Sequence, residues 1–354
     1  VLTIPEGVEL IVNGEVQNNG AILNEGTITA EGPVKNSGTL QNEGTITNND
    51  VIDNTGTIRN RGTMDGTADI NNTDGVISNN GTIVDEEQRV KGKAPVSGFE
   101  SWIDAGMAAQ EDTDYSADAE GNYTVMTAKG LAKIANIVNG TGGEAQDSLA
   151  GKTVTLAADI DLAQGGVLGY GRDTLTADNS WIPIGNASAN SFKGTFEGAG
   201  HKISNLYVQV SDAPSGLFGC NAGTIQNTEL ASGQIMLNVS PGSKSEYSVG
   251  MVAINVNTVS GCVNRAEVKA VSETRTDDNI IYVGGIAGLA NTSTATEGSR
   301  IIGCVNYGDV SGSGKSGTLT RIYAGGVCGY NYGGMISDRS SLIDDCANYG
   351  NVAV

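Results

Sequence analysis

The chain has 354 residues, 51 of them glycine, and a formal net charge of −20 from 20 basic and 40 acidic side chains. This length favours two domains. An acidic surface repels phosphate backbones and lacks the basic clusters that anionic membranes attract, so nucleic acid is an unfavourable partner and direct membrane insertion is not expected.

Residues 1–12 alternate in polarity and predict an entry strand or a cap for the repeats that come after them. From residue 13 to 84 the sequence Asn-x-Gly-Thr-Ile-x returns with a period of six. A unit this short can bury its single aliphatic side chain only by stacking on copies of itself, which predicts a β-solenoid. The glycines lie at 14, 20, 26, 32, 38, 44, 56 and 62, each followed two places later by an aliphatic residue or Met.

The irregular hexads set the length of one coil. The slot before the aliphatic residue departs from Thr or Ala at Glu15, Pro33, Val51 and Asp69, and the intervals 33−15, 51−33 and 69−51 are each 18. One side in three therefore differs, which favours a triangular coil of about 18 residues over a flattened coil of 12. An asparagine ladder is predicted at the corners, because Asn tolerates left-handed backbone angles and bonds to stacked neighbours; its members are Asn18, Asn24, Asn36, Asn42, Asn54 and Asn60.

The first solenoid is expected to end near Val84 and its domain to cover 1–90, with the charged, aperiodic segment 85–95 as a boundary. Residues 91–122 are predicted as a linker with a short helix carrying Phe99, Trp102, Ile103 and Met107. The acidic run at 112–122 departs from the EF-hand pattern, because Ala117 and Tyr123 stand where Gly and Glu belong. A solvated loop is therefore favoured over calcium, and neither a metal nor a cofactor is predicted.

Residues 123–354 are predicted as a second parallel β-helix. Tyr123–Val125 is expected as a strand, and Thr127 as the N-cap of a helix that runs to about Asn139 and plugs the open end. Four Gly-Leu-Phe-Gly-like blocks begin at Gly216, Gly250, Gly285 and Gly326, 34, 35 and 41 residues apart. Three short strands per turn are expected, with variation in length confined to loops.

Trp181-Ile182-Pro183-Ile184-Gly185, Phe192–Phe196 and Gly198–Leu206, followed by the Gly-Leu-Phe-Gly blocks, resemble the GLUG-repeat surface proteins of bacteria. The resemblance covers roughly residues 123–354, and the second block departs from it at Met251-Val252-Ala253. It implies a right-handed β-helix in a secreted, wall-attached protein, since similar repeats accompany adhesins and non-catalytic regions of immunoglobulin-A-cleaving metallopeptidases. Residues 1–90 resemble the Asn-Gly-Thr-Ile repeats that often precede such regions.

Cys262, Cys304 and Cys346 recur 42 residues apart, and buried free thiols are favoured over disulfides between coils. His201 is the only histidine, so every catalytic arrangement that needs one depends on it; the resemblance gives it a structural role. No histidine lies between 13 and 84, which argues against a hexapeptide-repeat acyltransferase.

A polysaccharide lyase or glycoside hydrolase is the enzymatic alternative, because parallel β-helices host both and need carboxylates that converge on one face. Asp159, Asp161, Asp344 and Asp345 are the candidates, yet no column of acids aligns across the blocks. Catalytic residues are therefore not predicted. A tyrosine-lined face that binds glycan or protein is predicted late in the chain, with packing between loops as the alternative; it comprises Tyr307, Tyr330, Tyr332 and Tyr349.

These patterns predict a non-enzymatic bacterial surface protein, an adhesin or stalk that presents a repetitive face to host or matrix glycans or proteins. A scaffold region of a larger surface enzyme is a further alternative. The protein is expected to be extracellular and monomeric. Because the chain begins without Met and ends within a repeat, a signal peptide and an anchor are expected outside this sequence.

Overall fold

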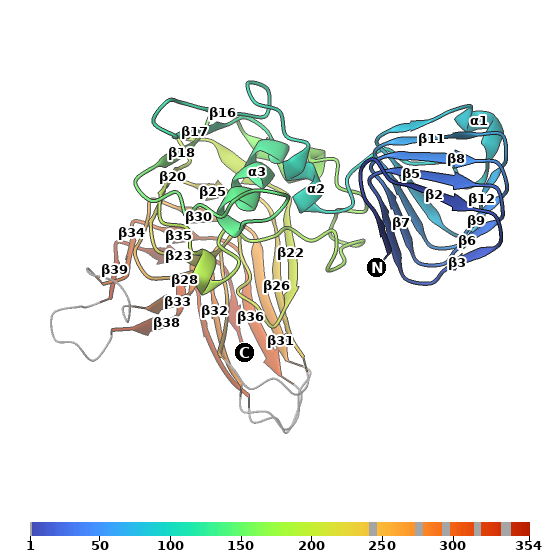
Figure 1. The fold of residues 1–354 in the computed structure, drawn as a ribbon. Helices are drawn as coiled ribbons and strands as arrows, with labels where there is room; N and C mark the ends of the chain where they lie inside the picture. The colour runs from blue at the N-terminus through green and yellow to red at the C-terminus, as the bar shows by residue number, and fades with distance from the viewer. Residues whose placement is uncertain (1, 241–245, 273–278, 292–297, 315–319, 334–340) are drawn as a thin grey trace. The chain divides into compact units, whose positions relative to one another are not determined.

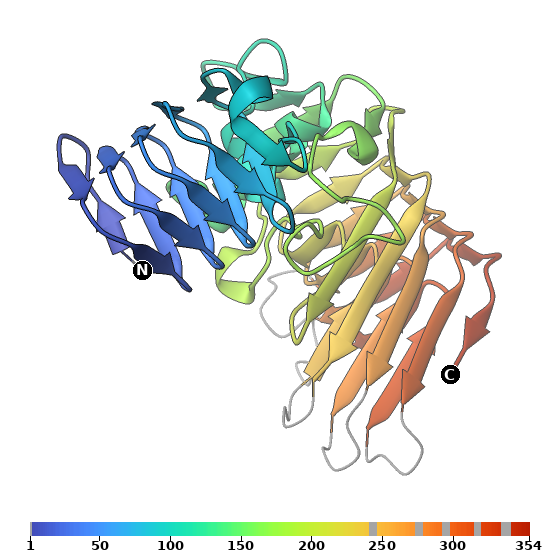
Figure 2. The ribbon, with the colours of Figure 1, turned by 90° about the vertical axis from the view of Figure 1, so that its right-hand side faces the viewer.

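The computed structural model describes residues 2–240, 246–272, 279–291, 298–314, 320–333 and 341–354. The chain folds as two compact units, Val1–Phe99 and Glu100–Val354. Both are built almost entirely from stacked parallel strands, so the prediction of two tandem β-solenoids is confirmed (Figures 1 and 2).

The first unit consists of three five-stranded parallel sheets, and each coil adds one strand to every sheet (Figure 1). The first sheet holds β1 (Leu2–Ile4), β4 (Ala21–Asn24), β7 (Thr39–Asn42), β10 (Thr57–Asn60) and β13 (Val76–Asn79). The second holds β2 (Glu9–Val12), β5 (Thr27–Ala30), β8 (Thr45–Asn48), β11 (Thr63–Gly66) and β14 (Thr82–Ile83). The third holds β3 (Val16–Asn18), β6 (Val34–Asn36), β9 (Ile52–Asn54), β12 (Ile70–Asn72) and β15 (Val90–Gly92).

The register confirms the coil of 18 residues. Val16 pairs with Val34, Ile28 with Ile46 and Leu40 with Ile58, each partner 18 positions further along the chain. The aliphatic side chains of the hexads point inward and form the continuous buried core of the unit. The expected entry strand at residues 1–12 is also present, because β1 and β2 pair with β4 and β5 as part of the first coil.

Asparagine ladders line two corners of this prism. The Nδ2 of Asn24 donates to the Oδ1 of Asn42 at 2.7 Å, and the Nδ2 of Asn42 donates to the Oδ1 of Asn60 at 2.8 Å. A parallel ladder runs through Asn18, Asn36, Asn54 and Asn72 at 2.7–2.8 Å. The stacking prediction is confirmed, but the prediction of left-handed backbone angles is wrong, since no ladder residue has a positive φ.

Glycine recurs in the hexads because the coils approach closely. A Cβ added to Gly38 would lie 2.0 Å from the carbonyl oxygen of Gly20, one coil below, and one added to Gly62 would lie 1.9 Å from that of Gly44. Neither glycine has a positive φ, so the requirement is space rather than backbone conformation.

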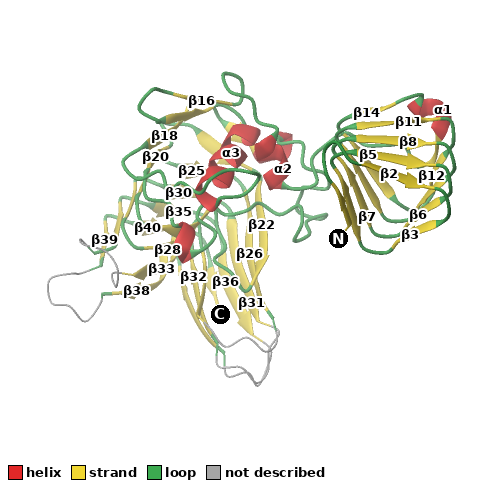
Figure 3. Cartoon of the chain, viewed as in Figure 1, coloured by secondary structure: helices red, strands yellow, loops and turns green. Residues whose placement is uncertain are grey.

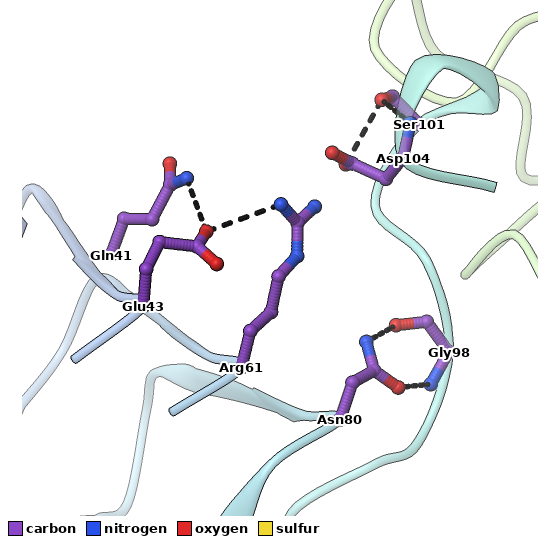
Figure 4. Close-up of polar contacts among 7 residues, drawn as sticks. All are labelled: Gln41, Glu43, Arg61, Asn80, Gly98, Ser101 and Asp104. Carbon is purple, nitrogen blue, oxygen red and sulfur yellow. Dashed lines mark hydrogen bonds and ion pairs between the residues drawn. The ribbon is translucent and has the colours of Figure 1, made fainter. Parts of the chain in front are cut away.

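Outward-facing side chains also pair between coils. Glu43 accepts hydrogen bonds from Arg61, 18 residues later, at 3.2 Å and from Gln41 at 2.8 Å (Figure 4). Asn80 pairs with the backbone of Gly98 through two hydrogen bonds, again across 18 residues. Exposed pairs of this kind contribute little to stability, so the buried ladders and core hold the coils together.

The predicted end of the first solenoid needs correction. Residues 85–95 are not a linker: α1 (Glu86–Arg89) forms one helical turn, and β15 then pairs with β12 through Ile70 and Val90. Arg89 is buried and donates from its guanidinium to the carbonyl oxygens of Ala68, Asp65 and Val84. These bonds satisfy carbonyls at the last coil, which allows the helical turn to replace a regular hexad.

The second unit contains five sheets. The largest holds β16 (Tyr115–Ala117), β17 (Tyr123–Val125), β18 (Thr153–Leu156), β20 (Thr195–Glu197), β24 (Thr224–Gln226), β29 (Thr258–Ser260), β34 (Arg300–Ile302) and β39 (Leu342–Asp344). The next holds β19 (Ile160–Asp161), β21 (Lys202–Ser204), β25 (Glu229–Leu230), β30 (Val263–Asn264), β35 (Val305–Asn306) and β40 (Ala347–Asn348). The third holds β22 (Leu206–Ser211), β26 (Gly233–Val239), β31 (Glu267–Ser272), β36 (Val310–Gly314) and β41 (Val352–Ala353).

Two smaller sheets complete these coils. One holds β23 (Phe218–Asn221), β28 (Val252–Asn255), β33 (Ala287–Asn291) and β38 (Cys328–Tyr332); the other holds β27 (Glu246–Val249), β32 (Ile280–Gly284) and β37 (Arg321–Gly325). A full coil therefore has five strands, and the expectation of three is wrong. A left-handed residue recurs at one bend, where the largest sheet meets the next; it is Asn227, Gly261, Gly303 or Asp345.

Helices cover the start of the second unit (Figure 3). The predicted helix is confirmed as α3 (Ala128–Asn139), with Thr127 as N-cap and Gly140 as C-cap, and it is joined by α2 (Trp102–Met107). Short 3₁₀ turns occupy Leu162–Gln164 and Ser188–Asn190. The expected helix near Trp102 is thus present, but α2 lies in the second unit and packs on α3. The predicted linker at 91–122 is therefore divided between the two units.

The carboxylate of Asp114 anchors the start of α3. Burial acts to raise its pKa, but hydrogen bonds from Thr127, the Gln110 N–H and Lys129 outweigh burial and lower the pKa below its usual value. A carboxyl whose pKa is lower in the folded state stabilises the fold above its unfolded pKa, near about 4, and loses that contribution as the pH falls through the folded pKa.

We therefore expect the urea midpoint of the second unit to be lower at pH 3 than at pH 6. Trp102 and Trp181 both lie in this unit, so tryptophan fluorescence reports on it alone. The Asp114→Asn variant should show a smaller difference between the two pH values than the parent. An identical difference in both proteins would contradict the role given to Asp114.

Candidate functional site

The four predicted tyrosines form two separate groups. Tyr307 and Tyr349 follow β35 and β40, and their rings stack with centroids 5.1 Å apart at an interplanar angle of 15°. Tyr330 and Tyr332 lie on β38 with ring centroids 6.4 Å apart. Since β38 belongs to a different sheet from β35 and β40, the prediction of one tyrosine face is replaced by two tyrosine groups.

The first group, called the Arg–Tyr column here, consists of Arg265, Tyr307 and Tyr349. The Arg265 guanidinium lies 4.2 Å from the centroid of the Tyr307 ring, and its Nε bonds to Glu229 at 2.8 Å. Both faces of Tyr307 are therefore in contact with neighbours, one with a cation and one with an aromatic ring. The ring of Tyr307 offers its edge and hydroxyl to solvent, while Tyr349 is 70% exposed.

The second group, called the tyrosine cluster here, is built around Tyr330. Its ring stacks on Tyr282 of β32 at 5.0 Å and meets Tyr323 of β37 at 5.5 Å, with Tyr332 beyond it. Tyr282 is buried, and this burial, followed by the nearby carboxylate of Glu246, raises its pKa to about 12. Tyr323, Tyr330 and Tyr332 are 37–40% exposed, so the cluster has a fixed base and an accessible surface.

Sequence reasoning missed three members of these groups, namely Arg265, Tyr282 and Tyr323. Their signal was present: Arg265, Tyr307 and Tyr349 are 42 residues apart, the same interval as the cysteines, and Tyr282 pairs in register with Tyr323. Columns in a solenoid can be extended by the coil length once one member is known.

The cysteines form the predicted column and are free. Cys262 and Cys304 are buried, and their thiols donate to backbone carbonyls such as Ile225 and Val259. Cys346 is only partly buried in the last coil and lies 3.4 Å from the Cys304 N–H. The column is accompanied by a further asparagine ladder, Asn264, Asn306 and Asn348, with bonds of 2.8 Å.

The candidate carboxylates do not converge on one site. Asp159 precedes β19 in an early coil and bonds to His201 at 3.3 Å, whereas Asp344 and Asp345 lie on or beside β39, the last strand of the largest sheet. Five strand intervals separate β18 from β39, which corresponds to about 24 Å. This exceeds the spacing of roughly 5–10 Å that paired carboxylates of glycoside hydrolases require.

The acidic run at 112–122 does not form a calcium loop. Asp114 points to the start of α3, while Asp118 accepts hydrogen bonds from the backbone of Glu120 and Asn122 and from the Asn122 side chain. Across the described part of the chain, no three His, Cys, Asp or Glu side chains gather as metal ligands would. Nor does any described helix combine the length and apolar character needed to cross a bilayer.

No known protein-family model matches the chain. Among curated proteins, halomucin from Haloquadratum walsbyi (strain DSM 16790 / HBSQ001) is 34% identical over 167 residues, a segment that is 44% of this chain and 2% of halomucin. The chain thus matches only a small part of that protein's length.

Among solved structures, a protein described as a candidate immunoglobulin A1 protease from Bacteroides ovatus aligns with a TM-score of 0.38 and 15% identity. The alignment covers 67% of this chain and 85% of that one. Both values are too low to transfer an activity.

Proposed function

We propose that the chain is part of a non-enzymatic, extracellular surface protein of a bacterium, acting as an adhesin or stalk that presents repeated side-chain columns to glycans or proteins. The proposal keeps the GLUG-repeat resemblance as its family expectation. The similarity to halomucin, named as a mucin, supports a surface location. The acidic charge of −20 also suits a protein that stays soluble in the extracellular medium.

The tyrosine cluster is the observation that carries the binding role. Its rings are held by mutual contact on three strands, β32, β37 and β38, so little side-chain freedom is lost when a ligand is bound. Aromatic rings give large apolar contact area with a polar hydroxyl, a combination suited to hydroxylated ligands and to protein surfaces. In the Arg–Tyr column, by contrast, the faces of Tyr307 are already occupied.

A glycan array probed with the whole chain tests the proposal. We expect a signal that falls at least about tenfold, or about 1.4 kcal/mol, when Tyr330 and Tyr332 are both replaced by alanine. The matched control replaces Tyr307 and Tyr349, and this variant should retain most of the signal. Unchanged binding after loss of Tyr330 and Tyr332 would remove the tyrosine cluster from the proposal, and depolymerisation of a polysaccharide by the purified chain would overturn the non-enzymatic assignment.

A further inference from the structure

A cleft of about 300 Å³ opens in the second unit beside the start of α3. This volume is at the lower end of the range for ligand-binding sites. Its walls come from the segment before β16, the first turn of α3 and the segment that contains β19; the polar and apolar side chains used below are Asp114, Met126, Lys129, Asp159, Ile160 and Asp161. The tyrosine cluster contributes no residue to it.

The carboxylates around this cleft are held in place by their neighbours. Asp114 bonds to Lys129 at 3.0 Å and Asp159 is bonded to His201. Asp161 accepts from Asn205 at 2.8 Å and from the Ala163 N–H at 3.0 Å, and it forms no ion pair with a described residue. Three carboxylates and one ammonium group leave a lining charge of 1 − 3 = −2. The cleft therefore favours a cationic group.

A strand edge opens at the same place. β19 is the terminal strand of its sheet and pairs with β21 on one side, while no described strand pairs with the other side. An unpaired edge offers backbone donors and acceptors to an extended chain. Met126 and Ile160 add apolar surface on which the methylene groups of a long basic side chain can pack.

We propose that this cleft binds an extended segment of a partner protein by taking up one Arg or Lys side chain, while the backbone of that segment adds to the edge of β19. Lys129 and the incoming cation share the carboxylates. The site is separate from the tyrosine cluster, and the proposal does not depend on glycan binding.

Methyl NMR of the whole chain, labelled at methionine and isoleucine, tests this with the methyl groups of Met126 and Ile160 as reporters. The probe is acetyl-Ala-Arg-Ala-amide, and the analogue with citrulline in place of arginine keeps the shape without the charge. We expect saturable shifts of both methyl signals with the arginine peptide below about 10 mM, and binding at least about tenfold weaker with citrulline. No saturable shift, or equal binding of the two peptides, would overturn the proposal, as would shifts caused by N-acetylglucosamine and not by the peptide.

Two variants sharpen the test. Asp161→Asn should weaken binding of the arginine peptide about tenfold, whereas Asp178→Asn, the same charge change at an exposed position outside the cleft, should leave it unchanged. Lys129→Gln removes the competing cation and should strengthen binding several-fold, which loss of structure would not do. Should Asp161→Asn fail to fold, the Lys129→Gln result decides: weaker or unchanged binding in that variant overturns the proposal.

Discussion

Replacing Asn42 by alanine is expected to lower the free energy of unfolding of the first unit by about 4 kcal/mol. Asn42 is fully buried; it accepts from Asn24 at 2.7 Å and donates to Asn60 at 2.8 Å and to the Thr63 carbonyl at 3.0 Å. Its loss leaves buried polar groups above and below without a partner. Each such group costs roughly 1–3 kcal/mol, so one substitution affects three coils.

The measurement must be specific to the first unit. Residues 1–98 contain no aromatic side chain, so hydrogen–deuterium exchange of this segment is the appropriate readout. Gln41→Ala is the matched control, because Gln41 lies next to Asn42 but points outward and bonds only to Glu43. We expect its effect to stay within about 0.5 kcal/mol. Equal effects of the two substitutions would show that the ladder does not stabilise the solenoid.

Replacing Gly38 by alanine is expected to destabilise the same unit by about 3 kcal/mol. The new Cβ would lie 2.0 Å from the Gly20 carbonyl oxygen, a backbone atom that cannot move without disturbing the coil below. Gly20 occupies the same column one coil earlier, and a Cβ there would meet no atom within 4 Å.

Gly20→Ala therefore serves as the control for Gly38→Ala. It should be neutral or stabilising by about 0.5 kcal/mol, because alanine restricts the unfolded chain. Exchange of residues 1–99 again gives the readout. A destabilisation of similar size at both positions would mean that glycine is needed for its backbone freedom and not for the close approach of coils.

The first solenoid could be predicted almost completely from its sequence, because one side chain per hexad repeats without insertion. The departures at Pro33 and Val51 were sufficient to assign the triangular coil. What failed was the interpretation of interruptions: Val90 returns to the column of Ile70 after 20 residues, and the buried Arg89 that makes this possible has no counterpart in the repeat. A single helical turn cannot be distinguished from a linker by periodicity alone.

The second unit was harder because loop length varies between its coils. Blocks 34, 35 and 41 residues apart hide the register, so the strands β27, β32 and β37 were not predicted and Tyr282 was not placed beside Tyr330. Tyr307 and Tyr330 lie only 23 positions apart, yet they belong to different sheets. Closeness in sequence therefore suggested one face where the structure has two groups. The cysteine interval of 42 held the information that could have separated them.

Deletion of one coil tests most directly the claim that residues eighteen apart are stacked neighbours. Removing residues 37–54 takes out β7, β8 and β9 and leaves the order of the three sheets intact, whereas removing residues 37–48 places two strands of the third sheet in succession. We predict that hydrogen–deuterium exchange of the remaining first unit stays slow and cooperative after the deletion of 18 residues and becomes fast after the deletion of 12. Slow exchange after the shorter deletion, together with fast exchange after the longer one, would contradict the triangular coil.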